Sequence, residues 1–480
     1  MYYSPTQSDI GIIKQTEKEI FVKIELLNRQ FKILESLQGS LISDSLNVDS
    51  GSKQRRTYSC EMQISDASFF IGNDKKIWID KYIRVYYGIK SARTKSIVWW
   101  LIGTFTYVDA SYHYNADTNT VSLSCADLMA DFDGTKQGQL TGYSLTIPAG
   151  EDVRSTLIAL LNQAGITKYL IESAEKEIPY DLEFSGSVTY CDIWTKICDL
   201  YDAWEFYFDV YGSFIWRKIP TGLSDPVLAD DTLFGDLCLD ETVNASFSGI
   251  YNVTEVWGKV LELTQNDRYA DSSELSGDTY QITLEGVSSL EDFHHLDRIG
   301  IKLCADSPYG AKVSINGLEP IPIFHDDGTV VADGRMKMDT TYVFSYRRNA
   351  GEEIQNCLYL LGQYQAYGIY KETNPDCPFS VDSLGYEIVN RLNYDHLYSD
   401  DLCFNQAQYL TYQTTAMMDT INLNLILIPW LDVNQKVIYT SHGASQPREY
   451  LIKSFNWSTL DGTMSVTLYK FLESFSFVNK

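Results

Sequence analysis

The side chains that most often carry catalysis are spread thinly along this 480-residue chain. It contains no G-x-S-x-G elbow, no H-E-x-x-H helix, no Walker loop and no G-x-G-x-x-G turn after a strand. The six histidines fall in different predicted elements, at positions His113, His294, His295, His325, His396 and His442. The sequence therefore predicts that the protein is not an enzyme, with no catalytic and no cofactor-binding residue.

Residue types that can bind a metal ion occur together at three places. His294 and His295 are adjacent, and neighbouring residues in a strand point to opposite faces, which makes them poor co-ligands. The segments 131–134 and 325–328 hold carboxylates that could meet Ca²⁺, yet neither continues to the Glu of an EF-hand loop. Aspartates before Gly mostly mark turns. We therefore predict no metal site and no cofactor.

Two further residue pairs have a non-catalytic interpretation. Asp230 and Asp231 lack the apolar surroundings that would raise a carboxyl pKa, so they are a weak candidate for a glycosidase-type pair. Cys191 and Cys198 lie on one face of a predicted helix, which places them in a core. The nine cysteines include no C-x-x-C pair, and this predicts buried thiols in a reducing compartment.

The net charge of −26 argues against a surface that grips phosphates, and it predicts no specific nucleic-acid binding. Simple solubility is the alternative explanation of an acidic surface. Charged residues near the N-terminus, such as Asp9 and Lys14, leave no apolar core for a signal peptide. The longest strongly apolar run, 425–428, is far short of the roughly 20 residues of a spanning helix, so we predict no transmembrane segment.

The elements that would position any site are mostly strands. Residues 420–428 alternate polar and apolar side chains, which is typical of a half-buried strand, and strands over 436–439, 450–457 and 463–469 follow. Three ordered blocks of the N-terminal part match this region, which favours a duplicated barrel. The matched blocks are Trp78 to Tyr87 with Trp430 to Tyr439, Trp100 to Phe105 with Tyr450 to Phe455, and residues 120–124 with 463–467.

Between the repeats, the predicted pattern changes. Strands are expected over 20–27 and 57–64, with a Ser- and Asp-rich loop over 39–51. An amphipathic helix is expected over 151–164, and a second one after the cap formed by Thr189 and Asp192. A hairpin is predicted across Tyr211 and Gly212.

These elements give a mainly β fold with α+β character. We predict a first tube-like antiparallel β-barrel over 1–145 and a small α/β domain over 146–240. The second tube-like barrel is expected over 241–263 and 400–480, with a strand over 251–263 opening it and a helix over 400–418 leading into its last strands. An inserted all-β module is expected over 264–375, with turns at Asn316-Gly317 and Asp327-Gly328, and a connecting segment over 376–399.

Three groups of residues resemble the baseplate or tail-tip hub proteins of tailed bacteriophages and of phage-tail-like particles. The first is the helix and hairpin from Cys191-Asp192-Ile193-Trp194 to Pro220, with its aspartate-centred turn at Asp209. The second comprises segments 378–382, 428–434, 450–454 and 462–466, and the third runs from Ile315 through Ile323 to Tyr342.

The resemblance implies a structural hub that forms a homotrimer. With two barrels per chain, three chains would present a pseudo-hexameric ring to a sixfold tail tube, as a symmetry adaptor. It further implies contacts with the tail tube, distal tail proteins, the tape measure protein and a spike or tip protein. DNA would pass through the lumen, along an acidic wall. The protein would be made in the host cytoplasm and reside in the virion.

Two other functions stay open from the residues. A carbohydrate-binding tail protein could contact a host surface glycan through exposed aromatic residues of the 264–375 module. A hydrolase of unrecorded type would need a cavity with convergent carboxylates.

Overall fold

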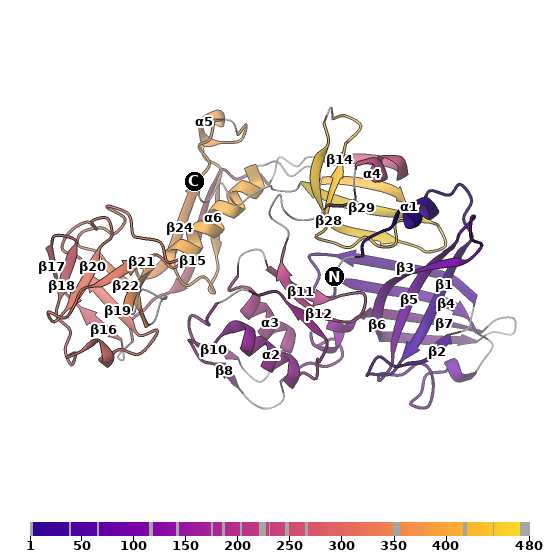
Figure 1. The fold of residues 1–480 in the computed structure, drawn as a ribbon, viewed down its shortest axis with the longest axis horizontal. Helices are drawn as coiled ribbons and strands as arrows, with labels where there is room; N and C mark the ends of the chain where they lie inside the picture. Colours follow the sequence, from indigo (N-terminus) through magenta and orange to yellow (C-terminus); the bar gives the residue numbers. More distant parts are fainter. Residues whose placement is uncertain are drawn as a thin grey trace.

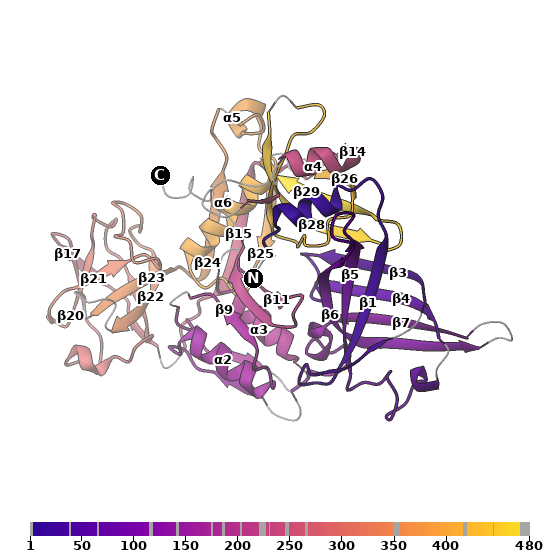
Figure 2. The same cartoon turned by 45° about the vertical axis from the view of Figure 1, so that its right-hand side comes forward.

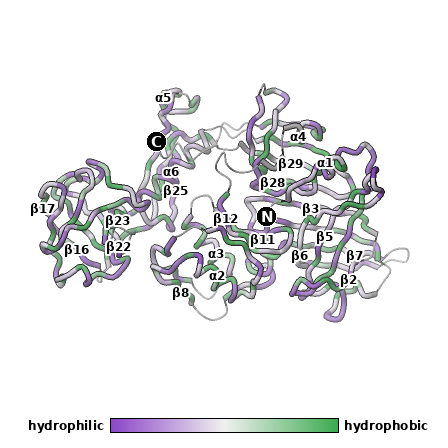
Figure 3. The backbone as a smooth tube through the Cα atoms, in the orientation of Figure 1, coloured by the Kyte–Doolittle hydropathy of each residue, from purple (hydrophilic) through white to green (hydrophobic). Residues whose placement is uncertain are grey.

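A computed structural model describes the chain except for residues 1–2, 38–39, 65–66, 115–118, 141–143, 174–175, 185–187, 202–203, 220–226, 230, 245–248, 265–266, 349–355, 376, 416–419, 445 and 471–480. The protein is mainly β and elongated, with a module at one end and the N-terminal strands at the other (Figure 1). Figure 2 shows the same arrangement after a 45° turn. Hydrophobic and hydrophilic residues alternate along many strands (Figure 3), as expected where only one face of a sheet is buried.

The N-terminal part forms a first strand set behind a short helix. After helix α1 (Gln7–Ile13) the strands are β1 (Ile20–Leu27), β2 (Ile33–Leu37), β3 (Ser40–Asp49), β4 (Arg56–Gln63), β5 (Tyr82–Lys90), β6 (Ile97–Tyr114) and β7 (Asn119–Asp127). Their spatial order is β3-β4-β7-β6-β5-β1-β2. Alternate residues of β4, from Arg56 through Tyr58 and Cys60 to Met62, are buried, so one face of the sheet lines a core.

The second strand set repeats this order. It consists of β13 (Val227–Ala229), helix α4 (Asp231–Leu237), β14 (Cys238–Asn244), β26 (Thr420–Ile426), β27 (Lys436–Tyr439), β28 (Arg448–Trp457) and β29 (Thr463–Lys470). The strands lie in the order β14-β26-β29-β28-β27-β13, which matches β3-β4-β7-β6-β5-β1 one for one. A single pairing differs, because β13 runs parallel to β27 whereas β1 runs antiparallel to β5.

Bulges fix the register of the repeat. In the β6–β7 pairing, a bulge changes the register just before the pair Asp109–Ser124. In the β28–β29 pairing, a bulge changes the register just before the pair Ser454–Thr467. Ser124 and Thr467 are the residues that the third sequence block had matched, so that block is confirmed. A second pair of bulges agrees: β3 shifts just before Ser43 and β14 just before Asp240.

The other two blocks were matched in the wrong register. Tyr82 pairs with Thr106 where Lys436 pairs with Leu451, so Lys436 corresponds to Tyr82 and not to Arg84. Tyr450 likewise corresponds to Phe105 and not to Trp100. Alternating patterns match in several registers, and the bulges that decide between them leave no mark in the sequence.

The two strand sets are joined into one 13-stranded sheet. Ser454 to Trp457 of β28 pair with Asp49 to Leu46 of β3, and the buried residues of both sets form a single core. Phe455 and Trp457 meet Val48 and Leu46 across the joint, and all four are at most 5% exposed. Burying a side chain of this size contributes about 1.5–3 kcal/mol.

Strand β3 corrects a prediction, because residues 39–51 were expected to be a loop. Its inward positions are Asp44, Leu46 and Val48, so an aspartate occupies the place where alternation calls for an apolar residue. The carboxylate is satisfied by hydrogen bonds from Tyr58 Oη (3.1 Å) and from Thr459 N (2.8 Å) and Oγ1 (2.6 Å).

The predicted opening of the second barrel is also wrong. Strand β15 (Val253–Val260) lies in a separate sheet, between β24 (Gln365–Lys371) and β25 (Val389–Asn393). Helix α6 (Asp400–Thr415) packs mainly on β15 and β24. In the chain the second set opens with β13, and the edge strand β14 follows. Most of its residues are exposed, and its sequence therefore lacks the apolar pattern of a barrel strand.

The small α/β domain follows the predicted pattern. Helix α2 (Val153–Gln163) buries Val153, Leu157, Leu160 and Leu161, and helix α3 (Tyr190–Cys198) begins at the Thr189 and Asp192 capping box. Strands β11 (Trp204–Phe208) and β12 (Phe214–Lys218) form the expected hairpin, with β9 (Tyr169–Ile171) parallel to β12. Two short strands, β8 (Leu145–Ile147) and β10 (Leu182–Phe184), complete it.

The inserted module has its own core and an eight-stranded arrangement. Its strands are β16 (Arg268–Ala270), β17 (Ser273–Ser276), β18 (Thr279–Ile282), β19 (Arg298–Lys302), β20 (Lys312–Ile315), β21 (Ile321–Phe324), β22 (Thr341–Arg348) and β23 (Asn356–Gly362). Turns occur at Asn316-Gly317 and at Gly328, each with positive φ. The segment predicted as a connection carries the short helix α5 (Val381–Leu384) and β25.

The bonds of Asp44 across the joint generate a prediction. Asp44→Ala removes the acceptor for Thr459 and Tyr58 and leaves three buried donors without their partner, so the free energy of unfolding should fall by about 1–3 kcal/mol. Urea titration followed by tryptophan fluorescence measures this loss. Asp74→Ala, which removes an exposed pair with Lys75 in the same strand set, is the control and should change stability by less than about 0.5 kcal/mol. Equal effects of the two substitutions would contradict the role given to Asp44.

Candidate functional site

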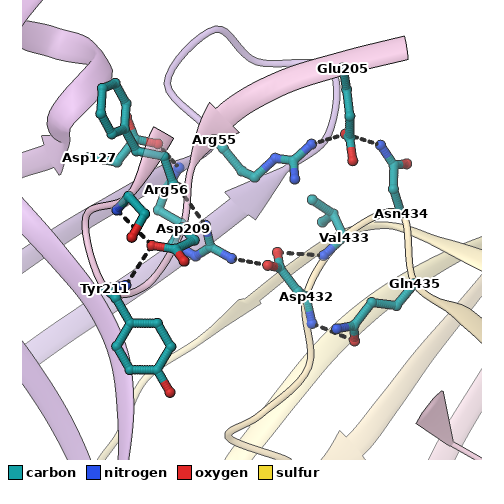
Figure 4. Close-up of polar contacts among 12 residues, drawn as sticks. Arg55, Arg56, Asp127, Glu205, Asp209, Tyr211, Asp432, Val433, Asn434 and Gln435 are labelled. Carbon is teal, nitrogen blue, oxygen red and sulfur yellow. Dashed lines mark hydrogen bonds and ion pairs between the residues drawn. The ribbon is translucent and has the colours of Figure 1, made fainter. Parts of the chain in front are cut away.

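A network of buried charges lies where the two strand sets and the small α/β domain meet (Figure 4). The first strand set contributes Arg55 and Arg56, at the start of β4. The small domain contributes Glu205 from β11, and the second set contributes Asp432 and Asn434 from the turn before β27. Arg55 pairs with Glu205 and Arg56 with Asp432, each across a domain boundary, so the network holds the three domains together.

Glu205 is the centre of one half of the network. Its carboxylate is paired with the guanidinium of Arg55 and, at 2.6 Å, with that of Arg217 on the neighbouring strand β12. Asn434 donates to the same carboxylate from the second strand set, with Nδ2 2.6 Å from Oε2. The Arg55 guanidinium also lies 3.5 Å above the ring of Tyr207, a favourable cation–π geometry.

Asp432 is the centre of the other half. It is paired with Arg56, which also donates to the carbonyl oxygen of Phe208 at 3.1 Å. Burial alone would raise the pKa of Asp432, but the guanidinium groups of Arg56, Arg55 and Arg217 hold this pKa below its usual value. The aspartate is thus kept ionised inside the protein by the cations around it.

Asp127 at the end of β7 fixes the start of β4. It accepts hydrogen bonds from the backbone N–H groups of Arg56 and Met129, both at 2.9 Å. Burial raises the pKa of Asp127 to about 6, despite these bonds. Two buried carboxylates therefore hold Arg56: Asp127 accepts its backbone N–H, and Asp432 pairs with its guanidinium.

A cavity of about 380 Å³ adjoins this network. Its wall is rich in aromatic residues from all three domains and from the N-terminal segment, namely Tyr3, Tyr86, Trp99, Trp100, Tyr207, Tyr211, Trp430, Phe455 and Trp457. The ring of Trp430 lies 5.9 Å from Trp100 and 6.1 Å from Tyr3, measured between centroids. Tyr3 therefore packs against the second strand set.

The carboxylates of the cavity wall are engaged in bonds that hold the fold. Asp432 is paired with Arg56, and Asp209 accepts the backbone N–H groups of Tyr211 (2.9 Å) and Ser213 (2.8 Å) in the β11–β12 turn. A general acid or base needs a carboxylate whose proton can move to a substrate. The arrangement is suited to fixing the angle between domains.

The two adjacent histidines considered as metal ligands contact different acidic residues. His295 Nε2 lies 2.7 Å from Glu177 of the small domain, whereas the His294 side chain is 90% exposed and 3.7 Å from Asp297. Both lie in a turn, and the expected strand at this position is absent from the fold as described. Within the described part of the chain, no three His, Cys, Asp or Glu side chains form a group that could hold a metal ion.

The aspartates of segments 131–134 and 325–328 take part in turns. Asp133 and Asp327 each accept the backbone N–H group two residues on, at 2.9 Å. Asp131 is buried and accepts from Tyr82 Oη at 2.9 Å. Asp230 lies outside the described residues, and α4 begins at Asp231.

Other sequence expectations concern cysteines and the membrane. Cys191 and Cys198 are buried on α3, and burial raises the pKa of Cys191 to about 11. All nine cysteines are free thiols. None of the helices that the structure describes combines the length and the apolar character that a membrane crossing requires.

Sequence reasoning missed Arg55 and Arg56. A signal was present, because Arg56 directly precedes the strand predicted over 57–64 and shares the inward parity of Tyr58, Cys60 and Met62. A charged residue at an inward position calls for a buried partner. The partners lie far away in the chain, at Glu205 and Asp432, and no local pattern identifies them.

A second charged cluster joins the inserted module to helix α6. His325 Nδ1 lies 2.8 Å from Asp401, and Arg335 lies 3.5 Å from Asp400. Asp400 also accepts the backbone N–H of Tyr367 at 3.0 Å. Burial raises the pKa of Asp400 to about 6, and the neighbouring Asp401 adds to this effect.

The Arg56–Asp432 pair generates a prediction about stability. Arg56→Met leaves Asp432 buried without its main counter-charge, so the free energy of unfolding should fall by about 3–5 kcal/mol. Adding Asp432→Asn removes that uncompensated charge and should recover part of the loss, which a double-mutant cycle in urea measures. The exposed pair Lys371–Glu387 is the control, and Lys371→Met should cost at most about 1 kcal/mol. Strict additivity of Arg56→Met and Asp432→Asn would contradict the pairing.

Asp400 generates a prediction about pH. An unfolded aspartate titrates near pKa ~3.9, below the value of about 6 in the folded chain, so the folded state binds the proton more tightly. The contribution of Asp400 to the free energy of unfolding therefore rises as the pH falls through about 6, and it is lost above that pH. Asp400→Asn keeps an oxygen for the Tyr367 N–H, and it should be more stable than the wild type at about pH 7.5 by on the order of 1 kcal/mol. That advantage should vanish near pH 4, and an advantage constant across pH would contradict the assignment.

Comparison with known proteins supplies the fold relationship. A family model described as "Domain of unknown function (DUF5048)" matches residues 376–475, which include α6 and β26 to β29. No curated protein sequence matches the chain. Among solved structures, the chain is similar to the 43 kDa tail protein of prophage MuSo2 from Shewanella oneidensis, with a TM-score of 0.51 and 10% sequence identity over 94% of this chain and 99% of that one.

Two further tail proteins are similar to the chain at lower scores. The tail protein from Neisseria meningitidis MC58 has a TM-score of 0.49 and 8% identity over 94% of this chain and 98% of that one. The prophage tail protein gp18 from Listeria monocytogenes EGD-e has a TM-score of 0.45 and 8% identity over 95% and 97%. At such low identity the likeness to the MuSo2 protein is one of fold. The chain therefore has the fold of a phage tail protein, and the resemblance predicted from its sequence is confirmed at that level.

Proposed function

We propose that the chain is a structural, non-enzymatic hub of a phage tail baseplate or tail tip. The observation that carries this proposal is the duplicated strand set, fused into one sheet within a chain that has a tail-protein fold. A chain with two equivalent halves can match a sixfold tube with three copies. The proposal is thus a homotrimer whose pseudo-hexameric ring continues or caps the tail tube.

In this position the ring contacts the tail tube on one face and distal tail proteins, including a spike or tip protein, on the other. The tape measure protein and later the DNA pass through its lumen. The net charge of −26 supports a lumen that repels DNA phosphates, so that DNA slides and does not bind. The site of action is the virion.

The domain junction supports a structural role. The carboxylates of Glu205 and Asp432 are bonded to guanidinium groups from other domains, which fixes the two strand sets and the small domain at set angles. A ring requires such fixed angles, because an error at each joint is repeated around it. Hydrolysis would require a free carboxylate in a cavity open to substrate.

Contact with a host glycan stays a prediction for the inserted module. Its exposed tyrosines include Tyr269 and Tyr309. Tyr269 lies on β16, at one end of the strand order, whereas Tyr309 precedes β20, near the other end. Sugar stacking in a groove needs aromatic rings gathered on one surface.

Light scattering of the purified chain tests the proposed assembly. At high protein concentration we expect a mass three times the 54.6 kDa of one chain. Negative-stain class averages of the same sample should show a ring with six similar lobes around a channel. A chain that stays monomeric at every accessible concentration, or averages without a central channel, would contradict the proposal.

A further inference from the structure

The pairing of β28 with β3 is the joint between the two strand sets of one chain. Each strand set also has a strand edge that is equivalent to one side of this joint and has no partner strand in the described fold. In the joint, residues 454–457 of β28 pair antiparallel with residues 46–49 of β3. Because the strand sets share one order and their bulges fix one register, each strand of the joint has an equivalent in the other set. The equivalent of β28 is β6, and the equivalent of β3 is β14.

The equivalent residues on β6 are fixed by its bulge. Asp109 corresponds to Ser454, the first residue after the shift in each strand, so Ser111 corresponds to Asn456 and Tyr112 to Trp457. Strand β5 pairs with β6 only as far as Thr106, while β7 pairs with it to Tyr114. The outer edge of β6 beyond Thr106 therefore has no partner strand among the described elements.

The equivalent residues on β14 are fixed in the same way. Asp240 corresponds to Ser43, again the first residue after a shift, so Val243 corresponds to Leu46 and Asn244 to Asn47. Strand β14 ends the sheet, with β26 as its one neighbour in the described fold. Val243 pairs with the buried Ile421 yet is 49% exposed, because its outer side is open.

We propose that the edge of β6 in one copy pairs antiparallel with the edge of β14 in the next copy. Tyr112 then lies opposite Val243 as Trp457 lies opposite Leu46, and Ser111 lies opposite Asn244 as Asn456 lies opposite Asn47. The proposal rests on the assembly given under Proposed function and names its contact. Joints within chains alternate with joints between chains, and the sheet continues from copy to copy.

The acidic residue beside the inner joint has a counterpart too. Asp44 on β3 accepts hydrogen bonds from Thr459, in the turn after β28. By the same register Glu241 on β14 corresponds to Asp44, and Tyr114 on β6 corresponds to Thr459. Glu241 has a side chain that is 10% exposed, and within the chain it accepts from Tyr439 Oη, from Ser441 Oγ at 2.5 Å and from the backbone N–H of His442 at 3.3 Å. The acidic position beside the joint is therefore repeated in β14, with hydrogen-bond donors from its own strand set.

A second copy is the occupant that the geometry favours. One open edge belongs to β6 and the other to β14. These two edges can pair with each other as their equivalents, β28 and β3, pair inside the chain. Contacts of this head-to-tail kind close into a ring when the rotation per copy allows it. Exposed strand edges offer a row of unpaired backbone groups that an added strand satisfies.

Cysteine cross-linking tests the register. Ser111 and Asn244 have exposed side chains, and directly opposed residues of antiparallel strands have Cβ atoms about 4.5–5.5 Å apart, close enough for a disulfide after slight adjustment. One variant carries Ser111→Cys and another carries Asn244→Cys, both with the exposed Cys304 changed to Ser. After mixing and mild oxidation, we expect a covalent dimer that contains one copy of each variant.

The control replaces Asn244→Cys with Ser276→Cys, which places an exposed cysteine on β17 of the inserted module. This pair should give no covalent dimer. Equal cross-linking of the control would overturn the proposed register. Absence of the Ser111–Asn244 product in a sample that is trimeric by light scattering would overturn the joint and leave the proposed hub standing. A monomeric sample would overturn both.

A charge at the joint supplies a second measurement. Val243→Lys should leave the isolated chain folded, because the side chain at this position is half exposed. In the proposed β6–β14 pairing between copies, the same substitution buries a charge. We expect the dissociation constant of the assembly to rise about tenfold or more. Val260→Lys on β15, where the valine is 44% exposed, is the matched control and should leave assembly unchanged. Identical dissociation of the two variants would overturn the proposal.

Discussion

The pairing of β28 with β3 is the contact on which the rest of the structure depends. It turns two strand sets into one sheet and gives them one hydrophobic core. Without it, Leu46 and Val48 would lie on an open edge, and the aromatic side chains Phe455 and Trp457 would face water. The apolar area buried at this joint therefore fixes one half of the chain on the other.

The buried charges restrict the angle at which that joint can form. Apolar packing tolerates small rotations, whereas an ion pair such as Arg56–Asp432 loses most of its energy when either partner is displaced in a low-dielectric interior. Glu205 extends the same restriction to the small domain through Arg55 and Asn434. In the hub that we propose, this rigidity would hold the two similar halves of each chain at a set angle.

Much of the local structure could be predicted from the sequence, because local patterns encode it. The β1 and β4 strands, the capped helix α3 and the β11–β12 hairpin follow from alternation, capping and turn residues. Strand β3 could not be predicted, since Asp44 occupies an inward position whose partners lie across the joint. The register of the repeat depended on bulges, and the buried charge network depended on residues far apart in the chain. Both are set by tertiary packing, which overrides local propensity.

Strand β3 belongs to a continuous sheet and is not an edge strand beside a separate barrel. Native-state hydrogen exchange of the backbone amides of Leu46 to Asp49 and Ser454 to Trp457 can test this arrangement. We expect both groups of amides to share one opening free energy, close to that of the β28–β29 pairing. Rapid exchange in β3, with β28 protected only where it meets β29, would contradict it.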